Sequence, residues 1–181
     1  MSKVYYSFID DTLTCVDFSN LNCKKRVDYI NSINNLDRKK QSYFVWKLLE
    51  YVTKDSNYEF QLHDSGQWVE KNDRIYFSIS HSGNLIAVAL SDKSIGVDVE
   101  KCDEKILRIK RRFDCKNVKE LNEIQNLTYC WTKEESKFKC GKAGAFKYSI
   151  VNKDGDEFVI TACYCDNDVT FENVDCKSLN F

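Results

Sequence analysis

The sequence predicts an α+β fold built from two similar halves that meet near residue 95. Three observations support this prediction. The order strand, helices, strands occurs twice along the 181 residues. Hydrophobic residues make up 43% of the chain, which is enough for a substantial core. No Gly/Ser-rich linker separates the halves, so we expect 1–95 and 96–181 to pack together around one cleft.

The first half is expected to open with a strand over 4–9, where aromatic and β-branched residues dominate. A short helix is expected over 24–33. Apolar residues recur at helical spacing over 37–53, which predicts a longer helix that Asp37 can cap. The polar residues 80–84 are expected to form a loop. Strands are expected over 58–62, 67–70, 75–79, 85–90 and 95–99.

The second half is expected to be helical first and β-rich afterwards. Helical periodicity covers 104–112, 117–127 and 128–142. Strands are expected over 147–151, 157–164 and 169–174. Asp154 and Gly155 lie in the turn between the first two of these strands. The two halves therefore share an order of elements, although no sequence repeat accompanies it.

The charge balance argues against a nucleic-acid-binding protein, because 27 basic residues are offset by 28 acidic ones. No stretch is apolar enough to span a membrane. The nine cysteines are odd in number and scattered, and no secretory leader precedes them, so we expect reduced thiols in a cytoplasmic protein. Cys163 and Cys165 lack a second pair at zinc spacing, so no metal site is expected there.

Two carboxylates lie two residues apart in one predicted strand, at Asp98 and Glu100. Alternate residues of a strand face the same side, so both carboxylates share a face while Val97 and Val99 point the other way. Like charges on one face are relieved by a cation, and magnesium takes one or two carboxylates together with substrate phosphates. The alternative is an ordinary exposed acidic strand face.

Two further segments carry polar chemistry. In the helix around Trp131, Glu135 and Lys139 are four residues apart and share a face. This pair is either a surface ion pair or a third metal ligand beside a phosphate-binding lysine. His81 follows an apolar strand among hydroxyl residues and a glycine, which suits either an anion pocket or a simple turn.

Together these segments resemble the surfactin-type family of 4′-phosphopantetheinyl transferases. The runs are FSISHSG over 77–83, IGVDVE over 95–100 and WTKEESKFK over 131–139. Members of that family show a Ser-His-Ser-Gly-like loop, a Gly-Ile-Asp-Ile-Glu-like strand and a Trp-x-x-Lys-Glu-x-x-x-Lys-like helix in this order. The resemblance implies the family fold, a pseudo-two-fold pair of α+β halves with a coenzyme A cleft between them.

The resemblance also implies an activity and its site residues. The protein would transfer 4′-phosphopantetheine from coenzyme A to a serine of an apo acyl or peptidyl carrier protein, releasing 3′,5′-ADP. Asp98, Glu100 and Glu135 would hold magnesium, for which manganese could substitute, and Lys139 would contact the pyrophosphate. The implied coenzyme A contacts are Arg38, Lys47, Ser65, Gly66, Gln67, Trp68, Ser80 and His81.

The implied mechanism needs a base for the target serine, whose hydroxyl is a poor nucleophile near neutral pH. Glu135, another carboxylate of the metal site or a metal-bound water would take the proton. The partner would be an acidic carrier protein of fatty acid, polyketide or nonribosomal peptide synthesis, and the enzyme a monomer. A basic helix face over 110–119 would meet it, or would simply be solvated.

This sequence departs from the family pattern at three places. Gln67 stands where the family often has lysine, Glu134 where it has lysine before the helix glutamate, and Asn117 near the place of a further glutamate. These departures keep two alternatives open. One is a non-catalytic relative that binds coenzyme A or a carrier protein. The other is a metal-dependent phosphoester hydrolase that needs no carrier.

Overall fold

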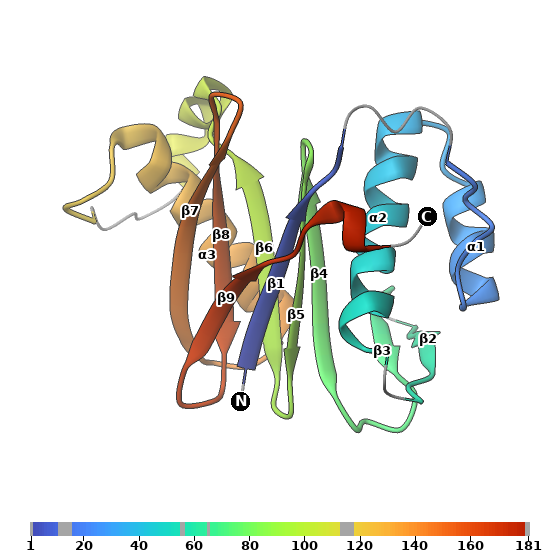
Figure 1. Cartoon of the computed structure of the whole chain (residues 1–181). Helices are drawn as coiled ribbons and strands as arrows, with labels where there is room; N and C mark the ends of the chain where they lie inside the picture. Colours follow the sequence, from blue (N-terminus) through green and yellow to red (C-terminus); the bar gives the residue numbers. More distant parts are fainter. Residues whose placement is uncertain (1, 11–15, 55–56, 65, 113–117, 180–181) are drawn as a thin grey trace.

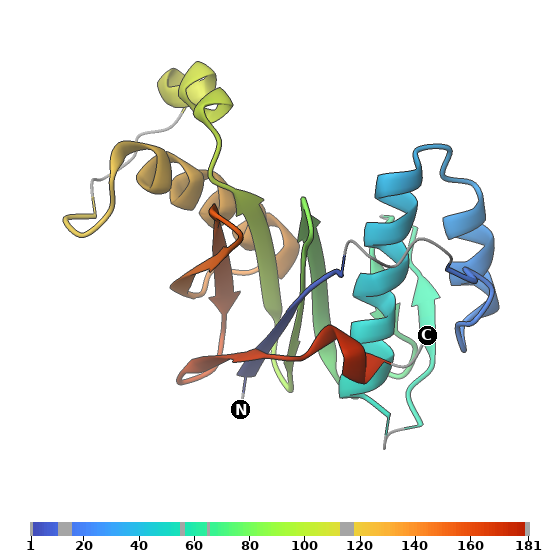
Figure 2. The same ribbon diagram turned by 45° about the horizontal axis from the view of Figure 1, so that its top comes forward.

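The computed structural model describes residues 2–10, 16–54, 57–64, 66–112 and 118–179. Over these residues the chain folds into a mixed α+β structure, as the sequence predicts. Two helices cover one sheet, a second sheet follows, and a third long helix lies on its outer side (Figures 1 and 2). The predicted strands appear in the predicted order, whereas the two helices predicted over 117–127 and 128–142 are one helix, Glu123–Cys140.

The first sheet has the strand order β4-β5-β1-β9. Its members are β4 (Tyr76–Ser82), β5 (Leu85–Ser91), β1 (Ser2–Phe8) and β9 (Val169–Asn173). Helices α1 (Lys24–Asn31) and α2 (Leu36–Val52) lie on one face of this sheet (Figure 1). The aromatic and aliphatic side chains in the middle of α2 are buried against the sheet, so the first core forms between α2 and the sheet; they are Tyr43, Phe44, Val45, Trp46, Leu48 and Leu49.

The second sheet has the order β6-β8-β7, all antiparallel. Its strands are β6 (Ile95–Lys101), β8 (Asp156–Tyr164) and β7 (Ala145–Lys153). Helix α3 (Glu123–Cys140) packs on β6 and β8, and η1 (Glu104–Arg112) packs against α3. The face of β6 that carries Val97 and Val99 joins a second core with the first sheet, so the opposite face, with Asp98, is turned toward α3.

Several boundaries differ from the sequence prediction. Asn35, not Asp37, caps α2, because its side chain accepts a hydrogen bond from the backbone N–H of Arg38 at 2.9 Å. The predicted loop 80–84 is mostly strand, since β4 continues to Ser82. Residues 104–112 form a 3-10 helix. A short hairpin, β2 (Phe60–Leu62) with β3 (Trp68–Glu70), follows α2.

The end of the chain crosses back to the first half. Strand β9 pairs parallel with β1, and η2 (Cys176–Leu179) contributes to the core under α2. The first sheet therefore contains a strand from the predicted second half, 96–181, and the end of the chain ties the two halves together. Among the described residues, no helix is long and apolar enough to cross a membrane.

Among the described residues, the cysteines are free thiols as expected, with the exception of Cys130. Cys130 is disulfide-bonded, so the prediction of wholly reduced cysteines is wrong there. The other cysteines that the structure describes are free: Cys23, Cys102, Cys140, Cys163, Cys165 and Cys176. The scattered spacing that argued against a disulfide framework gave no sign of a single pairing.

Candidate functional site

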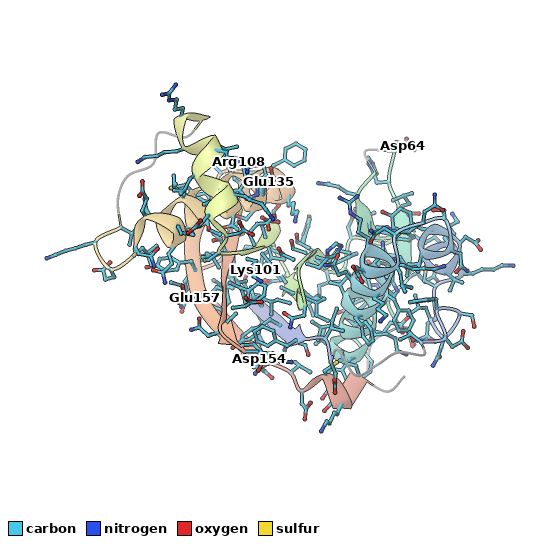
Figure 3. The ribbon with its side chains drawn as sticks, turned by 90° about the horizontal axis from the view of Figure 1, so that it is seen from above. Asp64, Lys101, Arg108, Glu135, Asp154 and Glu157 are labelled. Carbon is cyan, nitrogen blue, oxygen red and sulfur yellow. The ribbon has the colours of Figure 1, made fainter. Side chains whose placement is uncertain are left out.

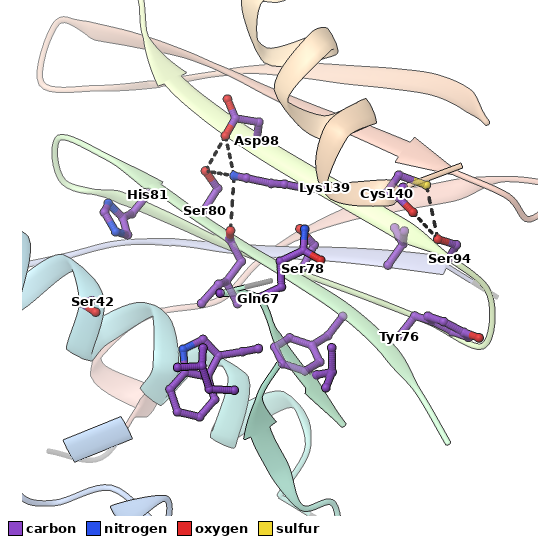
Figure 4. A pocket seen from close by; sticks show the side chains of 18 of the residues that line it. Ser42, Gln67, Tyr76, Ser78, Ser80, His81, Ser94, Asp98, Lys139 and Cys140 are labelled. Atoms are coloured by element: carbon purple, nitrogen blue, oxygen red, sulfur yellow. Dashed lines mark hydrogen bonds and ion pairs between the residues drawn. The ribbon is translucent and has the colours of Figure 1, made fainter. Parts of the chain in front are cut away.

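A cavity of about 780 Å³ lies where the first sheet, α1, the β2–β3 hairpin and the end of α3 meet. Its wall includes most of the residues that the sequence indicated: Gly66, Gln67, Trp68, Ser80, His81, Asp98 and Lys139. Figure 4 shows Asp98, Lys139, Ser80 and His81 gathered at one side of it. Residues from four separate stretches of sequence therefore converge on one cavity.

Three serines of β4 hold β6 in place. Val97, Val99 and Lys101 of β6 donate their backbone N–H groups to Ser78, Ser80 and Ser82 at 3.0, 3.2 and 3.2 Å. These hydroxyls thereby do what a neighbouring strand's carbonyls would do in a continuous sheet. The run Ser-Ile-Ser-His-Ser over 78–82 is extended and not a loop, because only an extended chain points every second side chain toward β6, where the serine hydroxyls accept these hydrogen bonds.

The same serines fix the two carboxylates. Ser80 donates to Asp98 Oδ1 at 2.8 Å, and Ser82 donates to Glu100 Oε2 at 2.7 Å. Alternation along β4 is thus matched to alternation along β6, and both carboxylates share a face as predicted. This arrangement orients each carboxylate through a buried or half-buried hydroxyl.

Asp98 is the centre of the site. It is 6% exposed, and Lys139 Nζ lies 2.7 Å from its Oδ1. Lys139 also donates to the Val97 carbonyl at 3.1 Å and to Ser80 Oγ at 3.1 Å. The second oxygen, Oδ2, is buried without a hydrogen-bond partner. A buried carboxylate oxygen left unpaired is costly, so this atom is a ready ligand for a cation.

Glu100 lies one step further along β6 and does not line the cavity. Burial raises the pKa of its carboxyl, and the neighbouring Asp98 raises it further. Hydrogen bonds from Ser82 and Trp131 act in the opposite direction. Two carboxylates on one face of a strand, of which Asp98 disfavours the ionised form of Glu100, favour a bound cation between them.

Glu135 lies on α3, one turn before Lys139, and is half-buried (Figure 3). Within the described ranges, no three His, Cys, Asp or Glu side chains are grouped so that they could hold a metal ion. Asp98 pairs with Lys139 instead. The three-carboxylate magnesium site of Asp98, Glu100 and Glu135 therefore stays a prediction.

His81 is held neutral. Burial is the main cause that lowers its pKa to about 4, and the nearby charges of Lys139, Arg26 and Arg38 contribute to the same shift. Arg38 itself is exposed at the start of α2. Arg26 and Lys139 line the cavity together with the neutral imidazole of His81, so this region offers hydrogen-bond donors, whereas Arg38 does not line the cavity.

Arg26 is a cavity residue that the sequence did not reveal. It is 4% exposed, its Nη2 donates to Ser42 Oγ at 2.7 Å and to the Ser42 carbonyl at 3.0 Å, and Nε has no partner. Its guanidinium lies 4.9, 4.8 and 5.5 Å from the rings of Tyr29, Trp46 and Trp68. Burial lowers its pKa to about 10. No local pattern distinguishes this arginine from a surface one on a short helix.

The remaining predicted residues have varied placements. Lys47 is buried on α2, where its Nζ donates to the Asn20 carbonyl at 3.3 Å and lies 3.9 Å from Glu50, and it does not line the cavity. Glu134 is exposed. Ser65 and Asn117 lie outside the described residues. Arg26, from the preceding helix, presents a cationic side chain to the cavity, and Lys47 does not.

Compared with known protein families and with curated proteins, the chain matches none. Its chemistry must therefore be argued from the site. A cavity that presents Arg26, Lys139 and a neutral His81 suits a polyanionic ligand. Asp98, with its unpaired Oδ2, adds an acceptor for a cation beside that ligand. Cationic donors and carboxylates side by side are typical of sites that act on phosphate esters with a divalent metal ion.

Proposed function

We propose that this protein transfers 4′-phosphopantetheine from coenzyme A to a serine of an apo carrier protein. One observation carries the proposal: alternate serines of β4 orient alternate carboxylates of β6 beside a cationic cavity. Those serines and carboxylates belong to the two segments, FSISHSG and IGVDVE, on which the family resemblance rests. The hydrogen bonds between these serines and carboxylates support the proposal because they join the two segments that carry the resemblance.

The residues present fit a magnesium ion. Asp98 offers an unpartnered Oδ2, Glu100 shares its face, and Glu135 is one helical turn from Lys139. Asp98, Glu100 and Glu135 would hold the ion. When bound, magnesium would neutralise the diphosphate and the charge that develops in transfer.

Arg26 and His81 would bind the 3′-phosphate of coenzyme A. Arg26 is anchored by Ser42 and keeps a free, buried Nε, so one edge of the guanidinium is available to an anion. His81, with a pKa of about 4, would donate a hydrogen bond from a neutral ring, and a bound phosphate would raise that pKa. Gln67 and Trp68 lie in the same wall, where the adenine would pack.

The transfer step needs a base, a nucleophile and a stabilised leaving group. Glu135 would accept the proton of the target serine, whose oxygen attacks the β-phosphorus of coenzyme A. The new serine O–P bond forms as the bond to the leaving phosphate oxygen breaks, and 3′,5′-ADP departs. Lys139 would turn from Asp98 toward the diphosphate and stabilise the growing negative charge.

Release of 3′,5′-ADP separates this proposal from its alternatives. The full chain is incubated with coenzyme A and magnesium, with and without an apo carrier protein, and nucleotides are quantified by chromatography. A transferase releases 3′,5′-ADP only with apo carrier. A hydrolase releases it without carrier, and a non-catalytic binder releases none under either condition. Carriers from fatty acid, polyketide and peptide synthesis are each tested, because the site does not select among them.

Asp98→Asn and Glu135→Gln provide the matched controls. Both keep the side-chain shape and remove the charge, so the fold should persist while release falls to background. Circular dichroism and urea unfolding check the fold. Release at the wild-type rate by either variant contradicts the role assigned to that carboxylate.

A further inference from the structure

Three free thiols cluster at the end of the cavity, where α3 ends. Cys140 Sγ lies 4.0 Å from Cys165 Sγ. The thiol of Cys163, near the end of β8, also interacts with the thiol of Cys140. Cys140 lines the cavity directly after Lys139 (Figure 4). The proposed transfer chemistry uses none of these sulfurs.

The surrounding backbone holds this cluster tightly. A Cβ on Gly96 would lie 2.0 Å from the Ser136 carbonyl oxygen and 2.5 Å from the Cys140 nitrogen, so α3 contacts β6 where only glycine fits. A Cβ on Gly144 would lie 2.5 Å from the Tyr164 carbonyl oxygen. The backbone at the end of α3 and in the segment after it therefore packs tightly on the sheet, which fixes the separation of the backbones of Cys140 and Cys165.

We propose that Cys140 and Cys165 form a dithiol modification site that closes to an intramolecular disulfide on exposure to a low-molecular-weight disulfide such as oxidised glutathione. The sulfurs must approach from 4.0 Å to about 2.05 Å, the S–S bond length. Because the backbone around both residues is already in contact, side-chain rotation supplies this movement.

Accessibility sets the order of the steps. Cys165 is half-buried, whereas Cys140 and Cys163 are 4% and 0% exposed. The Cys165 thiolate attacks oxidised glutathione, forming a mixed disulfide and releasing one glutathione thiolate. The Cys140 thiolate then attacks the Cys165 sulfur and releases the second. The two cysteine protons pass through solvent to the departing thiolates, so the reagent is reduced by two electrons and the protein is oxidised by two.

Burial makes the process slow at neutral pH. It raises the pKa of Cys165, and it raises that of Cys163 to about 12. Since the thiolate is the attacking form, closure should accelerate by up to about tenfold per pH unit between pH 7 and pH 9. Cys163, wholly buried and hardest to ionise, is the thiol that should stay reduced.

Peptide mapping tests the proposal. The native full chain, in which the free thiols are reduced and Cys130 keeps its disulfide, is incubated with oxidised glutathione, quenched with N-ethylmaleimide and digested with trypsin. Trypsin places Cys140 in the peptide 140–142 and Cys163, Cys165 and Cys176 in 154–177. We expect a linked pair of these peptides in wild type and in Cys163→Ser and Cys176→Ser. The link should be absent in Cys165→Ser and Cys140→Ser.

The contrary outcomes are equally defined. A link of normal yield in Cys165→Ser means that Cys163 or Cys176 of the same peptide is the partner and overturns the assignment. A stable glutathione adduct on Cys165 without the link, or no reaction at all in wild type, overturns the dithiol site. Cys165→Ser keeps the assignment testable if Cys140→Ser fails to fold, because residue 165 is not in the core. None of these outcomes depends on phosphopantetheine transfer.

Discussion

Replacing Ser80 with alanine tests the serine ladder most sharply. Its hydroxyl donates to Asp98 Oδ1 at 2.8 Å, accepts from the Val99 N–H at 3.2 Å and accepts from Lys139 Nζ at 3.1 Å. Ser78 supplies the matched control, because its hydroxyl accepts from the Val97 N–H at 3.0 Å in the same ladder and has no hydrogen bond to a carboxylate among the described residues. Both N–H groups belong to valines that are at most 1% exposed.

The magnitude follows from these contacts. Either alanine variant leaves one buried N–H unsatisfied, which costs about 1–3 kcal/mol. Ser80→Ala additionally removes a hydrogen bond to a charged carboxylate, which is worth about 1.5–3 kcal/mol. The free energy of unfolding should therefore fall by about 1.5–3 kcal/mol more in Ser80→Ala than in Ser78→Ala.

Urea unfolding of both variants measures that difference, with the slope on denaturant checked to be unchanged. Equal losses of unfolding free energy in the two variants would refute the reasoning, because Asp98 would then gain nothing from Ser80. A smaller loss in Ser80→Ala than in Ser78→Ala would show that the buried carboxylate is strained by the ladder.

Three further outcomes follow from the site. His81 has a pKa of about 4 in the fold and about 6.5 in the unfolded chain, so its contribution to the free energy of unfolding is fully present above pH 6.5 and falls by up to about 3 kcal/mol toward pH 4. His81→Gln should flatten that part of the pH profile of urea unfolding, and an unchanged profile would contradict the shift. Arg26→Gln should weaken the binding of coenzyme A, measured by calorimetry, about 10- to 100-fold and leave the binding of 3′-dephospho-coenzyme A unchanged. Equal weakening for both ligands, or the same loss of affinity in the variant Lys25→Gln of the exposed neighbour, would exclude Arg26 from the 3′-phosphate site. Lys139→Ala should lower the turnover of 3′,5′-ADP release by about 100-fold or more, and an unchanged turnover would exclude Lys139 from transition-state stabilisation.

Much of the fold could be predicted because its signals are local. The apolar periodicity of α2 reflects one buried face, the continuous apolar run of β5 reflects a strand that is buried on both faces, and each element appears where expected. The extent of β4 could not be predicted in this way. Its polar serines are typical of a loop when only the local sequence is considered. Their hydrogen-bond partners are in β6, 18 or 19 residues further along the chain, and local periodicity does not show such partners.

The same distinction separates the site residues. Asp98 and His81 are marked by short patterns in the strands that carry them, so they could be selected before the structure was known. Arg26 could not, because its significance comes from Trp46 and Trp68, which lie on other elements and enclose its guanidinium. Lys47 is the opposite case, because its basic side chain made it a candidate for binding a phosphate, but it contacts Asn20 and Glu50 and not the cavity.

The central claim is that this cavity moves a phosphopantetheine arm onto a serine. Intact-mass spectrometry of an apo carrier, incubated with the protein, coenzyme A and magnesium, tests it most directly. The account predicts that the carrier gains one phosphopantetheine, and that no gain occurs when its target serine is replaced by alanine. Carriers of every class that keep their apo mass, while a known transferase modifies them under the same conditions, would contradict it.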